Sequence, residues 1–144
     1  MSEIDHRAVI AGLPPETRRG LTEKSDAPGL LRLAVYLSLM AAFAILIAVR
    51  VPFWPLLMVP QGILIVFLFT LVHETIHGTA FRTDRLNTVL ANLSGFLILL
   101  PPTWFCYFHF AHHRYTHDPE NDPELMSPKP ETLAQYLLYL SGWA

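Results

Sequence analysis

The chain has 144 residues, of which 52% are hydrophobic and 15% are charged, and its formal net charge is −2. This composition leaves more apolar surface than a small soluble domain can bury, and it predicts an all-α integral membrane protein. No basic stripe points to nucleic acid. The single cysteine, Cys106, excludes an internal disulfide and thiolate-rich metal sites, so any metal must have nitrogen or oxygen ligands.

Residues 1–29 are predicted to form a polar cytoplasmic tail. They mix charge with Gly and Pro and lack the apolar core of a signal peptide, so the apolar run that follows should remain as an anchor. Basic residues gather close to the start of that run, and the positive-inside rule then places the tail in the cytoplasm. These residues are Arg7, Arg18, Arg19, Lys24 and Arg32.

Two clear transmembrane helices are predicted over residues 30–49 and 56–72, joined by a tight turn. Residues 33–49 and 51–72 contain no charge, and each run is long enough to cross a bilayer, which needs about 20 residues. We expect the second helix to continue through the polar residues that follow it, to about Ala80.

A first histidine cluster, His73-Glu74-Thr75-Ile76-His77, follows the second predicted span. His73 and His77 are four residues apart, so on a helix they share one face and could bind one metal. The same pattern is the signature of zinc proteases, in which Glu74 would be the general base. This cluster alone leaves both interpretations open.

A second cluster contains His109, His112 and His113, which also fall on one face of a helix. Five clustered histidines exceed the three protein ligands usual at a catalytic zinc, which favours two metals over one. A protease would need one further ligand rather than this triplet. His6 and His117 are interpreted as histidines without a metal role, His117 less firmly because it lies one turn beyond His113.

The apolar stretch 86–104 decides whether the two clusters can meet. A full crossing would separate them by the bilayer core, which is about 30 Å thick. We therefore predict a re-entrant or interfacial segment, for which Gly95 and Pro101-Pro102 allow a turn.

Two further segments follow the second cluster. Residues 117–130 form an acidic, Pro-rich loop, which is either a solvated connection or the source of a carboxylate that orients a ligand histidine. Residues 133–144 begin a further apolar helix that is too short to span, so the chain looks cut off.

The spacing His73-x-x-x-His77 followed by His109-x-x-His112-His113 resembles the first two histidine boxes of the membrane fatty-acid desaturase and hydroxylase superfamily. Residues 112–124 are similar to the stretch after the second box in bacterial members, including the carotenoid ketolase and hydroxylase relatives. The resemblance covers about residues 56–124. It makes residues 30–144 a partial desaturase-like domain of a four-span scaffold, in a bacterial inner membrane with its histidine boxes in the cytoplasm.

The resemblance implies O2-dependent di-iron oxidation, either desaturation or hydroxylation, of a fatty-acyl or other lipid-like substrate. Electrons would come from a ferredoxin, rubredoxin or cytochrome. Glu74 would fix the tautomer of a histidine by accepting its other N–H. The implied iron ligands are His73, His77, His109, His112 and His113.

The family's third histidine box is absent from this sequence, because no histidine follows His117. The two irons would then be completed by ligands outside this chain, as expected for the N-terminal portion of a longer protein. A zinc-dependent intramembrane protease and a non-catalytic membrane fragment remain the alternatives.

Overall fold

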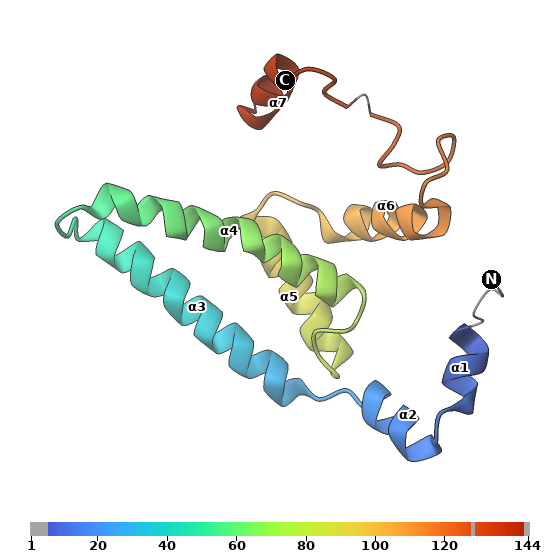
Figure 1. The fold of residues 1–144 in the computed structure, drawn as a ribbon. Helices are drawn as coiled ribbons and strands as arrows, with labels where there is room; N and C mark the ends of the chain where they lie inside the picture. The colour runs from blue at the N-terminus through green and yellow to red at the C-terminus, as the bar shows by residue number, and fades with distance from the viewer. Residues whose placement is uncertain (1–5, 128, 143–144) are drawn as a thin grey trace. The chain divides into compact units, whose positions relative to one another are not determined.

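The computed structural model describes residues 6–127 and 129–142, in which every regular element is an α-helix (Figure 1). The predicted fold class is therefore confirmed. One compact unit ends at Leu100 and a second begins at Pro101. The first unit contains α1 (His6–Gly12), α2 (Pro15–Thr22), α3 (Asp26–Ala48), α4 (Trp54–Ile76) and α5 (Asp84–Leu97), and the second contains α6 (Pro102–Tyr115) and α7 (Leu133–Leu140).

Both predicted transmembrane helices are present. α3 and α4 have 23 residues each, or about 34 Å at 1.5 Å per residue, and both are apolar enough to cross a membrane. α3 begins at Asp26 rather than at residue 30, because Pro28 falls in the first turn, where a missing N–H costs no helical hydrogen bond. The tail before it is also partly helical, in α1 and α2.

α3 and α4 form a hairpin. The connection between them uses the left-handed region at Arg50 and Phe53, where φ is 53° and 63°. Along the pair, the Tyr36 hydroxyl donates a hydrogen bond to the carbonyl of Leu64. The two helices therefore pack side by side within the first unit.

The stretch 86–104 is not one continuous spanning helix. α5 has 14 residues, or roughly 21 Å, which is shorter than the hydrocarbon core. It ends at Leu97, and Leu99 adopts a left-handed φ of 58°. This break confirms that the stretch is not one ordinary span; it is part of a bent helix pair, which is either a broken span or a re-entrant loop. α5 packs against α4 and buries a face of small and polar residues, Asn87, Ala91, Ser94 and Gly95, which permits close approach.

The start of α3 is tied to the loop that joins α4 and α5. The Thr83 N–H and hydroxyl donate to the Asp26 carboxylate at 2.9 and 2.6 Å. The Lys24 ammonium donates to the Gly78 carbonyl at 2.7 Å. We call these contacts, together with the packing of Gly29, the α3 tie.

Gly29 lets α3 approach this loop closely. A Cβ at residue 29 would lie 2.5 Å from the Ala80 carbonyl oxygen and 2.8 Å from the Phe81 ring. Phe81 is 2% exposed, and the Asn87 side chain bonds both its N–H and its carbonyl, at 3.2 and 2.9 Å. The loop is therefore packed and hydrogen-bonded from α3 on one side and α5 on the other.

Gly29→Ala should destabilise the first unit, because the new methyl group meets backbone rather than a movable side chain. We expect a loss of about 1–3 kcal/mol, as for other overpacked sites, measured by thermal unfolding in detergent. Gly20→Ala is the matched control, since a Cβ there has no neighbour within 4 Å. Equal stability of the two variants would contradict the close approach.

Candidate metal centre

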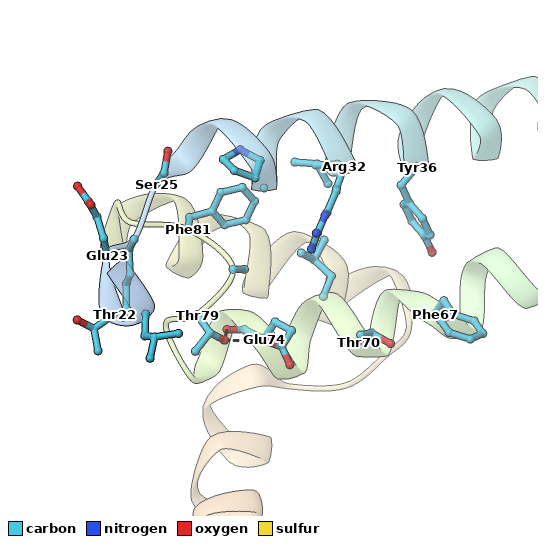
Figure 2. Close-up of a pocket in the computed structure, with 17 residues that line it drawn as sticks. Thr22, Glu23, Ser25, Arg32, Tyr36, Phe67, Thr70, Glu74, Thr79 and Phe81 are labelled. Carbon is cyan, nitrogen blue, oxygen red and sulfur yellow. Dashed lines mark hydrogen bonds between the residues drawn. The ribbon is translucent and has the colours of Figure 1, made fainter. Parts of the chain in front are cut away.

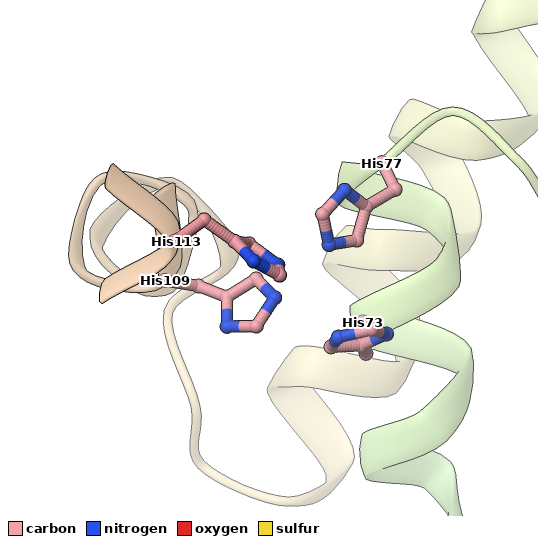
Figure 3. Close-up of side chains that lie close together, drawn as sticks. All are labelled: His73, His77, His109 and His113. Carbon is pink, nitrogen blue, oxygen red and sulfur yellow. The ribbon is translucent and has the colours of Figure 1, made fainter. Parts of the chain in front are cut away.

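The first histidine pair lies at the end of α4. His73 and His77 project from one face of the last turn, with ring centroids 4.8 Å apart and ligand nitrogens within 4.8 Å (Figure 3). Two nitrogens bound to one metal at about 2.1 Å each can be at most about 4.2 Å apart, so a small side-chain adjustment allows both to bind. The i, i+4 spacing therefore supplies a workable metal-binding pair.

α4 ends at Ile76, so the prediction that it continues to about Ala80 is wrong. Gly78 has a φ of 64°, which is the left-handed cap that a glycine supplies without strain. The Gly78 and Thr79 N–H groups bond back to the carbonyls of Thr75 and Glu74, each at 3.0 Å. His77 is therefore the C-cap residue of α4, with a right-handed helical backbone conformation, and the chain then turns toward the α3 tie.

Glu74 is held between a histidine and a threonine. One carboxylate oxygen lies 3.0 Å from His73 Nδ1, and the other accepts from the Thr79 hydroxyl at 2.7 Å. Because a carboxylate only accepts, this contact places a proton on His73 Nδ1, which makes Nε2 the nitrogen that would bind a metal. The sequence analysis did not identify Thr79, whose approach depends on the turn at Gly78.

The second cluster lies on α6, and it separates into a pair and a third histidine. His109 and His113 have ring centroids 4.3 Å apart and ligand nitrogens within 4.8 Å (Figure 3). His109 is buried and His113 is exposed. The His112 ring is 6.2 Å from that of His109, and its Nδ1 faces a carboxylate instead. Of the three histidines predicted to share one face of the helix, His109 and His113 therefore lie together, and His112 is directed toward a carboxylate.

Asp122 is the carboxylate that His112 contacts. His112 Nδ1 lies 2.9 Å from Asp122 Oδ1, and the carboxylate also accepts from the N–H groups of Glu124 and His117 at 3.0 and 3.2 Å. Asp122 is 1% exposed, although it lies in a loop. Of the two interpretations of the 117–130 loop, these contacts favour the one in which an acidic side chain orients a ligand histidine.

The same contacts shift the ionisation of both partners. The hydrogen bond to Asp122 raises the pKa of His112. Burial alone would raise the pKa of Asp122, but the hydrogen bonds from His112, Glu124 and His117 hold it below its ordinary value. The acidic run after the histidines was a signal for such a residue, but it could not indicate which carboxylate turns inward.

His6 and His117 are the two histidines outside the clusters. His6 begins α1, and its side chain lies outside the described part of the chain. His117 has a φ of 68° and donates its backbone N–H to Asp122. The backbone of His117 therefore helps to hold the Asp122 carboxylate that contacts His112.

Known proteins resemble this chain over much of its length. The family model described as fatty acid desaturase matches residues 49–144. A chloroplastic omega-3 fatty acid desaturase of Glycine max is 36% identical over 84 residues, covering 58% of this chain and 18% of the relative. A temperature-sensitive sn-2 acyl-lipid omega-3 desaturase (ferredoxin) of Arabidopsis thaliana is 36% identical over 84 residues, covering 58% and 19%.

A Brassica napus omega-3 desaturase is 34% identical over 84 residues, covering 58% of this chain and 20% of the relative. The chain thus spans about a fifth of the length of these curated relatives. No solved structure matches it. The family match includes both histidine clusters and the membrane helix that carries the first of them, and the chain therefore belongs to the fatty acid desaturase family.

Proposed function

We propose that this chain supplies two histidine boxes of an O2-dependent di-iron enzyme that oxidises a fatty-acyl or other lipid-like substrate by desaturation or hydroxylation. The observation that carries the proposal is the presence of two histidine pairs at i, i+4 spacing, each with its ligand nitrogens within 4.8 Å. Family membership and the omega-3 desaturase relatives favour desaturation of an acyl chain.

The donor set fits iron. Imidazole nitrogen suits iron among the transition metals, and the chain has one cysteine, so thiolate ligation is not available within it. The residues that would hold the iron are His73, His77, His109, His112 and His113. Five ligands do not saturate two iron ions, and we propose that ligands outside this chain complete the centre.

The chain's own carboxylates would orient these ligands. Glu74 holds Nδ1 of His73, and Asp122 holds Nδ1 of His112, so each ring offers Nε2 to the metal. Thr79 in turn holds the second oxygen of Glu74. Bound iron supplies the O2-activating chemistry, with electrons from a ferredoxin, rubredoxin or cytochrome, and the name of the Arabidopsis relative favours ferredoxin.

The distribution of basic residues indicates the orientation of the chain in the membrane. Basic residues flank the starts of α2 and α3 and follow α4, whereas the connection between α3 and α4 carries only Arg50. We propose that the N-terminus and the histidine boxes face the cytoplasm, at a bacterial inner membrane. Residues 1–29 would then be the cytoplasmic segment and residues 30–144 the partial catalytic domain.

The zinc-protease interpretation of the first cluster is less well supported. A general base must reach a metal-bound water, but both oxygens of Glu74 are engaged, by His73 and by Thr79. Membership of the desaturase family also favours iron.

Iron binding tests the ligand assignment. The chain in detergent should bind ferrous iron, and His73→Ala or His113→Ala should weaken that binding at least about tenfold, the scale seen when even an outer partner of a ligand is lost. Iron content by mass spectrometry and affinity by competition with a chelator measure the effect. His6→Ala is the control. Equal iron in all four proteins would contradict the assignment.

The Asp122 contact makes a separate prediction. Asp122→Asn should weaken metal binding by about 10–100-fold, because the amide holds the His112 N–H less firmly than a carboxylate does. Nitrogen-15 spectra of the His112 ring should show mixed tautomers. Asp118→Asn, in the same loop, should leave both unchanged, since Asp118 bonds Asn121 and the Glu120 N–H instead. Equal loss of metal binding in both variants would contradict the prediction, because it would indicate a general disturbance of the loop.

Lipid analysis tests the reaction. The gene product, expressed in a bacterial host with a ferredoxin donor, should introduce a double bond or a hydroxyl group into acyl lipids, and His109→Ala should abolish that product. Gas chromatography with mass spectrometry measures it. Zinc at one ion per chain, with activity lost in Glu74→Gln but kept in His112→Ala, would instead support the protease.

A further inference from the structure

A groove of about 810 Å³ lies in the first unit between α3 and α4, beside the loop that ends α4 (Figure 2). Most of its wall is apolar, including Leu33, Tyr36, Phe67 and Phe81. Because α3 and α4 are the membrane-crossing helices, the groove is placed where a lipid could enter it sideways.

Arg32 is the unusual side chain in this groove. It lies nearly two turns inside α3, and its guanidinium points between the two helices (Figure 2). It makes no hydrogen bond or ion pair with any residue that the structure describes. Arg32 lies near the start of this membrane-crossing helix, and basic side chains between such helices near a membrane surface bind anionic lipid headgroups.

The other ionisable side chains of the lining form no ion pair with Arg32 among the described residues. The Lys24 ammonium bonds the Gly78 carbonyl. Both oxygens of Glu74 are engaged, by His73 and by Thr79, and Glu23, directly after α2, also lines the groove. The Tyr36 hydroxyl donates to Leu64. The groove therefore combines apolar walls with two basic side chains, Arg32 and Lys24, which suit an anionic group.

We propose that this groove binds one anionic glycerophospholipid, with its phosphate on Arg32 and an acyl chain between Tyr36 and Phe67. A guanidinium binds phosphate oxygens in pairs, and the aromatic walls suit a hydrocarbon chain. This lipid site is additional to the metal centre and does not depend on iron binding. Because Glu74 lines the groove and also contacts His73, the lipid would lie beside the carboxylate that holds His73.

Native mass spectrometry of the chain in detergent tests the proposal. Phosphatidylglycerol should bind at one molecule per chain and more tightly than phosphatidylcholine. Arg32→Gln should weaken phosphatidylglycerol binding about fivefold, the scale of one basic side chain at an anionic headgroup, and Arg32→Lys should restore part of it. Arg85→Gln, which removes an exposed charge on α5 outside the groove, should bind as the wild type does.

A photoactivatable phosphatidylglycerol gives a second measurement, which needs no variant. Crosslinks should fall on peptides that contain Tyr36 or Phe67. Equal weakening by Arg32→Gln and Arg85→Gln, no preference over phosphatidylcholine, or crosslinks outside the groove would each overturn the proposal. Displacement of the lipid by millimolar inorganic phosphate would do so as well, because the site would then bind free phosphate.

Discussion

The α3 tie is the interaction on which the first unit depends. It joins residues 57 positions apart, because the carboxylate of Asp26 holds both donors of Thr83. The loop that it holds follows directly from the last turn of α4 and leads into α5, so its position determines where the first histidine pair lies and where α5 begins. The absence of a side chain at Gly29 makes the approach possible.

A second constraint is the direction of each imidazole. A histidine ring that binds a metal through one nitrogen usually donates the N–H of the other to a carboxylate, a carbonyl or water, which fixes the direction of the ring. The chain meets this requirement in two ways, with a carboxylate adjacent in sequence for His73 and one ten residues away for His112. The distant carboxylate needs an ordered loop, and the backbone donors of His117 and Glu124 help to fix it there.

The length of α5 connects the fold to the proposed chemistry. A helix of 14 residues cannot cross the hydrocarbon core, and the left-handed residue at Leu99 ends its continuation. Histidine clusters on opposite membrane faces could not share a metal centre. A segment that turns back would keep both clusters on one membrane face, as the proposed di-iron centre requires.

The amino-acid sequence by itself determined the helical class, the two spans, the histidine spacing and the family, because these depend on composition and on the helical period. The tertiary structure decided which acidic residue turns inward, that Thr79 reaches Glu74, and that Arg32 lines a groove with no ion pair to any residue that the structure describes. It also decided where helices end, since Gly78 stopped α4 before Ala80 and Pro28 allowed α3 to begin at Asp26. Such features depend on turns and on contacts between residues far apart in the chain, which local periodicity does not encode.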